Sequence, residues 1–242
     1  LDCAVALQEL QNMGVSNVIS FDAHDPRVQN ATPLMGFDNV MPTYQVLKAL
    51  INQVPELKLD WYNFMVVSPD EGAMSRNMYY ASVLGVNLGM FYKRRDYSRV
   101  VNGRNPIVAH EYLGDSVEGK DVFIADDIIS SGESMLDIGY ELKKRKARRI
   151  FCYATYPIFT NGLDRFDEAY ERGVITGVLG SNLTYRTEDL RSREWFYEVD
   201  CSKYIAYLIA ALNHDMSMSS LIDPHEKIEN LLIQHGFKQP RP

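Results

Sequence analysis

The stretch Asp121–Ser134 (DVFIADDIISSGES) decides the fold that this sequence predicts. It begins with an apolar run typical of a buried strand, passes two adjacent acids and a turn of small residues, and continues into a helical pattern. A buried strand that leads through such a turn into a helix is the repeating unit of parallel α/β sheets. We therefore expect an α/β protein, with helices covering both faces of a mostly parallel sheet.

The same alternation continues on both sides of this stretch. Apolar runs typical of buried strands are Asn17–Phe21, Asn63–Ser68, Val86–Tyr92, Asp121–Ala125, Arg149–Thr155 and Val174–Gly180. Helical patterns are Thr43–Gln53, Gly72–Leu84, Glu133–Lys146, Gly162–Arg172 and Ser202–Asn213, with a further helix expected after Asp223. Ligands of parallel sheets bind beyond the carboxyl ends of the strands, so the residues after each strand are the candidates for chemistry.

The composition is that of an ordinary globular protein. The 242 residues include 25 Lys and Arg, 32 Asp and Glu, and 46% hydrophobic residues, for a net charge of −7. The longest apolar run, Tyr204–Leu212, is far shorter than the roughly 18 residues that suggest a membrane span. The acidic balance argues against a general nucleic-acid partner. The three cysteines form no CxxC pair, which favours a reducing compartment, and we expect a cytoplasmic protein.

The residues after Asp121–Ala125 form the first candidate site. Asp126 and Asp127 repel one another, so a cation should lie near them. The turn that follows, residues 130–134, combines hydroxyls and a glycine with a helix N-terminus, which suits a phosphate group. The two acids could then hold sugar hydroxyls, or magnesium through water. A capped helix after a strand with surface acids explains the same residues equally well.

Three other strand ends carry polar residues. Asp70 follows one strand and suits a hydrated divalent ion, although a turn with a helix cap is an equal alternative. Lys93-Arg94-Arg95 follows another strand and opens a basic stretch, which is either a solvated loop or a mobile loop that closes over phosphates. His24 stands between two acids after the first strand, as a metal or phosphate ligand or as a structural histidine.

In this order, the four strand ends resemble the ribose-phosphate diphosphokinases, also called phosphoribosyl pyrophosphate synthetases. The resemblance extends over roughly Leu1 to Ile222. The motifs that carry it are D-x-H at Asp22–His24, SPD-x-G-x-x-x-R at Ser68–Arg76, KRR at Lys93–Arg95 and DD-I-I-x-x-G-x-S at Asp126–Ser134. Each motif is weak alone, whereas the ordered set is specific.

The resemblance implies two phosphoribosyltransferase-like domains and a magnesium-dependent transfer of the diphosphoryl group of ATP to the 1-hydroxyl of ribose 5-phosphate. It also implies a homo-oligomer, either a dimer or a hexamer. Lys93 and Arg95 would be catalytic, and His24 and Asp70 would contact magnesium or the ATP phosphates. The residues implied to bind ribose 5-phosphate are Arg95, Asp126, Asp127, Ser130, Ser131, Gly132, Glu133 and Ser134.

The resemblance also divides the chain. Residues 1–55 would be the C-terminal part of a first domain whose beginning is missing, 59–213 the second domain, and 214–242 a C-terminal strand with an extra helical tail. Two residues depart from the family's loop: Ser130 replaces an Asp, and Glu133 adds an acid that must point away from a bound anion.

Two other functions remain open. A non-catalytic regulatory relative, of the synthetase-associated type, would share the fold but has little need of Lys93–Arg95. A salvage phosphoribosyltransferase would share the DD loop, yet should lack the D-x-H and SPD motifs at this spacing.

Overall fold

Seven strands form the main sheet in a computed structural model of the chain, which describes residues 2–95 and 107–239, without the side chains of 93–95 and 107–110. Their order across the sheet is β5-β4-β3-β6-β7-β8-β9, and every neighbouring pair is parallel except β4 and β5. The strands are β3 (Phe64–Ser68), β4 (Asn87–Arg95), β5 (Ile107–Leu113), β6 (Asp121–Ile129), β7 (Arg149–Pro157), β8 (Gly177–Ser181) and β9 (Phe196–Val199). The predicted mostly parallel sheet is confirmed.

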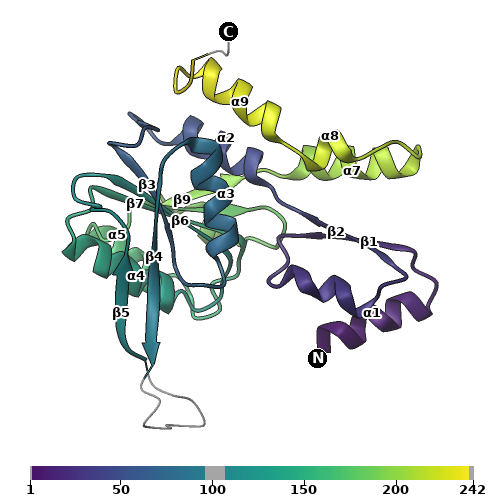
Figure 1. Cartoon of the computed structure of the whole chain (residues 1–242). Coiled ribbons are helices and arrows are strands. Elements are labelled where there is room, and N and C mark those ends of the chain that lie inside the picture. The colour runs from purple at the N-terminus through teal and green to yellow at the C-terminus, as the bar shows by residue number, and fades with distance from the viewer. Residues whose placement is uncertain (1, 96–106, 240–242) are drawn as a thin grey trace.

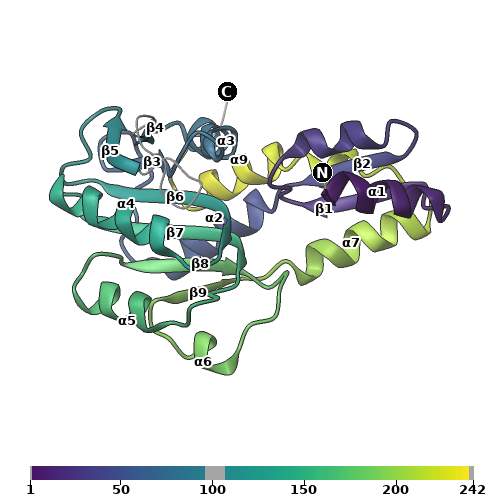
Figure 2. The ribbon, with the colours of Figure 1, turned by 90° about the horizontal axis from the view of Figure 1, so that it is seen from below.

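Helices cover both faces of this sheet (Figures 1 and 2). One face packs against α2 (Thr43–Gln53), α3 (Met74–Leu84) and α9 (His225–Gln234), and the other against α4 (Glu133–Lys144), α5 (Asp164–Glu171) and the short α6 (Glu188–Arg191). The central strand supplies both cores by alternation, since Phe123 and Ala125 face the first set of helices, while Val122 and Ile124 face the second. Within the described ranges, no helix is both long and apolar enough to cross a membrane.

A smaller part of the molecule lies to one side of the main sheet (Figure 1). It holds a parallel pair of strands, β1 (Asn17–Phe21) and β2 (Gly36–Val40). Its helical elements are α1 (Asp2–Asn12), the 3₁₀ turn η1 (Pro26–Ala31), α7 (Ser202–Asn213) and α8 (Ser219–Ile222).

Each of the two parts packs against a helix from the opposite end of the chain. From the late chain, α7 packs on β1 and β2 through Tyr204 and Leu208, whereas α2 from the early chain packs on the main sheet through Val46, Leu47 and Leu50. The packing therefore crosses the predicted division between residues 55 and 59. The assignment of the two parts to two phosphoribosyltransferase-like domains stays a prediction.

Two strands run further than predicted and carry site residues with them. β6 continues to Ile129 because its end pairs with the end of β7, so Asp126 and Asp127 lie within a strand rather than after it. β4 continues to Arg95 because its backbone pairs with the antiparallel β5, a partner that the sequence pattern did not predict. The backbone of Lys93 and Arg95 is accordingly strand, and not the start of a loop.

The C-terminal strand predicted within 214–242 is wrong. The described residues 214–239 contain α8 and α9 and no strand. Ile228, Leu231 and Leu232 recur at helical spacing and are buried against the main sheet. Pro224 is the N-cap residue of this helix, where its missing N–H costs no helical hydrogen bond. The helical tail that was expected is present.

Candidate functional site

Three of the four polar strand ends meet at a cavity of about 420 Å³ beside the carboxyl edge of the main sheet. His24 comes from the end of β1, Asp70 follows β3, and Asp126 and Asp127 belong to β6. Arg76 of α3 completes the polar lining. This is the edge at which parallel α/β sheets bind ligands.

Arg76 fastens the end of β1 to the main sheet. Its Nε and Nη2 donate to Oδ1 of Asp22 at 2.9 and 2.7 Å, and the two side chains are only 8% and 2% exposed. Thr155 of β7 donates its hydroxyl to Oδ2 of Asp22 at 2.6 Å. Burial raises the pKa of Asp22, while the bonds from Arg76 and Thr155 act in the opposite direction. Because Asp22 is so enclosed, its charge depends on Arg76.

Arg76 is also the cation that the adjacent acids require. Its Nη1 lies 3.6 Å from Oδ1 of Asp126, and its Nη2 lies 3.9 Å from Oδ1 of Asp127. The sequence placed Arg76 in the SPD motif but did not assign it to the acids. The signal was its position in the first turn of a helix that follows a neighbouring strand, from which it can reach the end of β6.

The two acids differ in their affinity for protons. Burial and the neighbouring Asp127 raise the pKa of Asp126. The pKa of Asp127 is lowered, because hydrogen bonding with Asp126 and the charges of Arg76 and His24 outweigh its own burial. The pair thus offers one carboxylate that stays ionised beside one that holds a proton more readily, and both can accept hydrogen bonds from hydroxyl groups.

His24 joins the smaller part of the molecule to the acid pair. Its Nδ1 lies 2.9 Å from Oδ2 of Asp127, and its side chain is 84% exposed. With Nδ1 engaged, Nε2 is the ring nitrogen that a ligand would reach. Asp70 lines the same cavity, and its Oδ1 accepts the backbone N–H of Ala73 at 3.1 Å, within the turn that precedes α3. The N-cap of α3 is Ala73, so Asp70 is not the helix cap.

Magnesium fits this donor set only if water and substrate phosphates supply the rest of its coordination. Among the described residues, no group of three or more His, Cys, Asp or Glu side chains could hold a metal ion by itself. Magnesium in proteins is commonly held by one or two carboxylates together with water and substrate phosphates, and Asp70, Asp126 and Asp127 can supply such carboxylates. His24 suits magnesium less, because imidazole is a ligand of softer metals.

The predicted phosphate loop connects β6 to α4. Gly132 takes the left-handed conformation, with φ +78°, and immediately precedes the first turn of α4. A Cβ at this position would collide with the ring of Phe166, so the turn requires glycine. The backbone of Ser130 is fixed by Thr160, whose N–H donates to the Ser130 carbonyl at 2.9 Å. The first N–H groups of α4 have no partners within the helix and can receive an anion.

Glu133 points away from this loop, as an acid beside an anion site must. Its carboxylate pairs with Arg165 of α5 at 2.5 Å. The acid therefore belongs to the contact between α4 and α5, and the loop can meet an anion with its backbone and with the hydroxyls of Ser131 and Ser134.

Lys93 and Arg95 cannot be assigned a place in the cavity. Their backbone pairs with His110 and Ile107 of β5, and their side chains lie outside the described residues. Tyr92, the residue before them, does line the cavity. Their catalytic role stays a prediction.

Comparison with known proteins agrees with this geometry. The model of the phosphoribosyl transferase domain family matches residues 37–175. A ribose-phosphate pyrophosphokinase of Vibrio parahaemolyticus is 28% identical over 216 residues, which cover 88% of this chain and 63% of that protein. A ribose-phosphate pyrophosphokinase of Ralstonia nicotianae is 29% identical over 181 residues, which cover 74% of this chain and 53% of that protein.

A solved structure shares the fold. Phosphoribosylpyrophosphate synthetase from Mycobacterium smegmatis matches with a TM-score of 0.71 and 20% identity, over 88% of this chain and 64% of that one. The chain thus spans less than two thirds of the length of each of these relatives.

Proposed function

Because the chain belongs to the phosphoribosyl transferase domain family, we propose that it carries the ribose 5-phosphate site of a ribose-phosphate diphosphokinase. This activity transfers the diphosphoryl group of ATP to the 1-hydroxyl of ribose 5-phosphate, and yields phosphoribosyl diphosphate and AMP. The names of the curated relatives support the proposal.

The hydrogen bond between His24 and Asp127 is the observation that carries the proposal. It joins the D-x-H motif to the DD loop across 103 residues of sequence. A salvage phosphoribosyltransferase needs the DD loop but should lack the D-x-H and SPD motifs, whereas a diphosphokinase uses all three. A shared cavity for His24, Asp70 and Asp127 therefore favours the diphosphokinase.

In this proposal the chain acts mainly by positioning. Asp126 and Asp127 accept hydrogen bonds from the ribose hydroxyls, while Ser130, Ser131, Gly132, Glu133 and Ser134 hold the 5-phosphate through their backbone and hydroxyl groups. Bound magnesium would neutralise charge on the ATP phosphates, in a site that Asp70 and His24 border. Lys93 and Arg95 add positive charge where the transferred phosphates develop negative charge.

Several features of the proposal go beyond the site. The protein would be a cytoplasmic homo-oligomer, a dimer or a hexamer, with ATP and ribose 5-phosphate as substrates and no nucleic-acid partner. The intact Lys93-Arg94-Arg95 segment favours an enzyme over a non-catalytic regulatory relative, which has little need of these cations.

AMP release tests the proposed activity. The full-length natural protein is mixed with ATP, ribose 5-phosphate and magnesium chloride, and AMP is measured against a reaction without ribose 5-phosphate. We expect AMP that depends on ribose 5-phosphate and that Asp126→Asn reduces. Folded protein that releases no AMP would contradict the proposal, and nucleotide formed from phosphoribosyl diphosphate and a purine base would favour the salvage alternative.

Ribose 5-phosphate binding tests the loop separately. A carboxylate introduced by Ser131→Asp should repel the 5-phosphate and weaken binding by about tenfold or more, as measured by calorimetry. Ser217→Asp adds the same charge at an exposed residue outside the loop, between α7 and α8, and serves as the matched control. Equal affinities of the two variants for ribose 5-phosphate would contradict the placement of the 5-phosphate in this loop.

A further inference from the structure

The predicted phosphate loop has a second wall, made by the turn before α5 and by the first turn of that helix. The N–H of Phe159 donates to the carbonyl of Ile129 at 3.1 Å, just before the loop begins. At the other end of the loop, Gly132 lies against the ring of Phe166, which belongs to the first turn of α5. The start of α5 is therefore fixed beside the loop.

Arg165 lies in this first turn of α5 and pairs with Glu133 at the start of α4. Its Nη1 is 2.5 Å from Oε1 of Glu133, and the two side chains are 57% and 56% exposed. Both line a surface cavity of about 300 Å³ between the two helices. Among the described residues that line this cavity, Arg165 is the one cation, whereas Asp137 and Glu168 are acids like Glu133. Arg165 therefore offsets part of a local surplus of negative charge.

The dipoles of the two helices favour Glu133 and disfavour Arg165. A carboxylate is stabilised at a helix N-terminus, as Glu133 is in α4, whereas a cation in the first turn opposes the dipole of α5. Glu168, one turn further along α5, pairs with Arg172 at 2.9 Å and not with Arg165. The favourable contact that Arg165 makes is thus with α4, across the gap between the helices.

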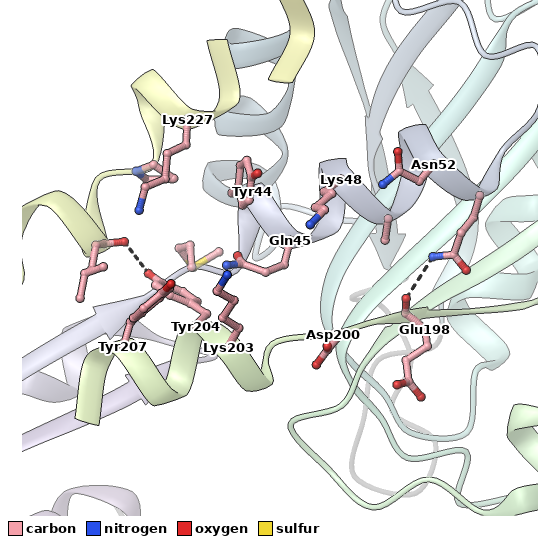
Figure 3. Close-up of a pocket in the computed structure, with 15 residues that line it drawn as sticks. Tyr44, Gln45, Lys48, Asn52, Glu198, Asp200, Lys203, Tyr204, Tyr207 and Lys227 are labelled. Carbon is pink, nitrogen blue, oxygen red and sulfur yellow. Dashed lines mark hydrogen bonds between the residues drawn. The ribbon is translucent and has the colours of Figure 1, made fainter. Parts of the chain in front are cut away.

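Other described cations are placed away from Glu133. Arg76 is bound to Asp22 and to the acid pair of β6. Lys48, Lys203 and Lys227 line a separate cavity of about 560 Å³ between α2, α7 and α9 (Figure 3), which shares no lining residue with the cavity between α4 and α5. The basic residues of α4 itself lie in its last turn, at the end far from the loop.

An unpaired Glu133 would oppose the function proposed for the loop. Glu133 directly follows Gly132, the N-cap of α4, so its carboxylate belongs to the helix terminus at which the 5-phosphate would bind. Two negative groups at one terminus repel each other. The ion pair with Arg165 cancels much of this repulsion, and it holds the carboxylate toward α5.

We propose that Arg165 is a positioning residue for the phosphate loop: it neutralises Glu133 and holds that carboxylate toward α5, so that the loop accepts a phosphomonoester dianion. The inference rests on the proposed function, because it takes ribose 5-phosphate as the ligand of the loop. Arg165 sets the affinity for the phosphorylated sugar through Glu133, without contacting the sugar itself.

Calorimetry with ribose 5-phosphate tests the proposal on the full-length protein at low salt. Arg165→Gln should bind the sugar phosphate about fivefold or more weakly, because Glu133 is then uncompensated. Glu133→Gln should bind it as tightly as the wild type or more tightly, and the double variant should return close to the wild-type affinity. An ion pair that only held α4 and α5 together would make both single variants weaker and the double variant no better.

Two further variants serve as controls. Arg172→Gln removes an arginine of similar exposure, 59%, from the same helix, and should leave the affinity for ribose 5-phosphate unchanged. Arg165→Lys keeps the charge and should bind within about twofold of the wild type. Added salt should reduce the difference between Arg165→Gln and the wild type, because salt screens the charge of Glu133.

Three results would overturn the role of Arg165: unchanged affinity in Arg165→Gln, an equal loss in Arg172→Gln, or weaker binding by Glu133→Gln. Because the pair is more than half exposed, the single variants should keep the urea unfolding midpoint of the wild type. A loss of affinity that is explained by unfolding of Arg165→Gln would assign the residue to the fold and overturn the proposal as well.

Failure of this inference is distinguishable from failure of the proposed function. If the wild-type protein binds no ribose 5-phosphate, or if Ser131→Asp binds it normally, the phosphate site itself is wrong, and the role of Arg165 is wrong with it. If the wild type binds, Ser131→Asp weakens binding and Arg165→Gln does not, the site stands and only the role of Arg165 is wrong.

Discussion

Replacing Arg76 by methionine should destabilise the protein more than any surface substitution. The side chain is 8% exposed and donates at 2.9 and 2.7 Å to Asp22, which is 2% exposed. Methionine keeps most of the volume but removes the charge and the donors. Among the described residues, Asp22 would then keep the hydroxyl of Thr155 as its one side-chain donor.

The expected loss is about 3–5 kcal/mol, the usual cost of removing one partner of a buried ion pair. A domain is stable by about 5–15 kcal/mol, so this loss is a large fraction of the whole. Much of it comes from the uncompensated charge on Asp22. The double variant Arg76→Met, Asp22→Asn should therefore cost less than the sum of the two single changes, because it leaves no unpaired charge at Asp22. Asparagine also tolerates the positive φ of 46° at this position, so this substitution adds no backbone strain.

Urea unfolding followed by circular dichroism measures these differences. Arg27→Met is the matched control, because Arg27 makes a similar two-point contact with Asp25 through Nε at 2.9 Å and Nη2 at 2.6 Å, but is 83% exposed. The control should leave the unfolding midpoint unchanged. A loss below about 1 kcal/mol for Arg76→Met, or strict additivity in the double variant, would refute the account of Arg76 as a buried counter-charge.

Three further predictions concern the loop, the catalytic strand and the thiols. Gly132→Ala should lower the free energy of unfolding by more than the roughly 1–2 kcal/mol of a left-handed non-glycine residue, because its Cβ also displaces Phe166, and should weaken ribose 5-phosphate binding in calorimetry. Lys93→Ala should lower kcat for AMP release by about 10² or more with little change in ribose 5-phosphate binding, if Lys93 acts on the transferred phosphates. In the folded protein a thiol reagent should label only Cys3 from pH 7 to pH 9, because burial raises the pKa of Cys152 and of Cys201 to about 12 and keeps both as unreactive thiols.

Each of these has a direct control. Gly119 also has a positive φ, of 73°, but faces open space, so Gly119→Ala should cost less than Gly132→Ala, and equal costs would discount the contact with Phe166. Lys144→Ala changes an exposed lysine on α4 and should leave kcat intact, whereas a normal kcat for Lys93→Ala would reject its catalytic role. All three thiols should react in urea, and more than one reactive thiol in the folded protein would contradict the burial.

Elements with a complete local pattern were predicted to the residue. The strand Asn17–Phe21 and the helices Thr43–Gln53 and Ser202–Asn213 have the predicted bounds. Their apolar spacing is contained within the segment, so no distant partner is needed to recognise them. β2 and β5 were not predicted, because each is held by pairing with the strand that precedes it in the chain, β1 or β4, and such pairing leaves a weak trace in a short sequence window.

The sequence predicted which residues form the candidate site, but not which of them pair with one another. Asp70, Asp126 and Asp127 stand at strand ends, and the topology of a parallel sheet brings such positions to one edge. The sequence also required a cation near the acids, yet it could not show that Arg76 supplies it while also pairing with Asp22. That choice depends on how α3 packs against β6 and on how the end of β1 meets the main sheet.

By itself, then, the sequence determined the α/β class, the strand ends that carry chemistry and the requirement that Glu133 face away from the loop, because each follows from residues close together in the chain. The tertiary structure alone decided that Glu133 pairs with Arg165, that His24 reaches Asp127, and that Arg76 pairs with Asp22. These contacts join segments tens to more than a hundred residues apart. Their geometry is set by the packing of helices against two sheets, and no local pattern of residues records it.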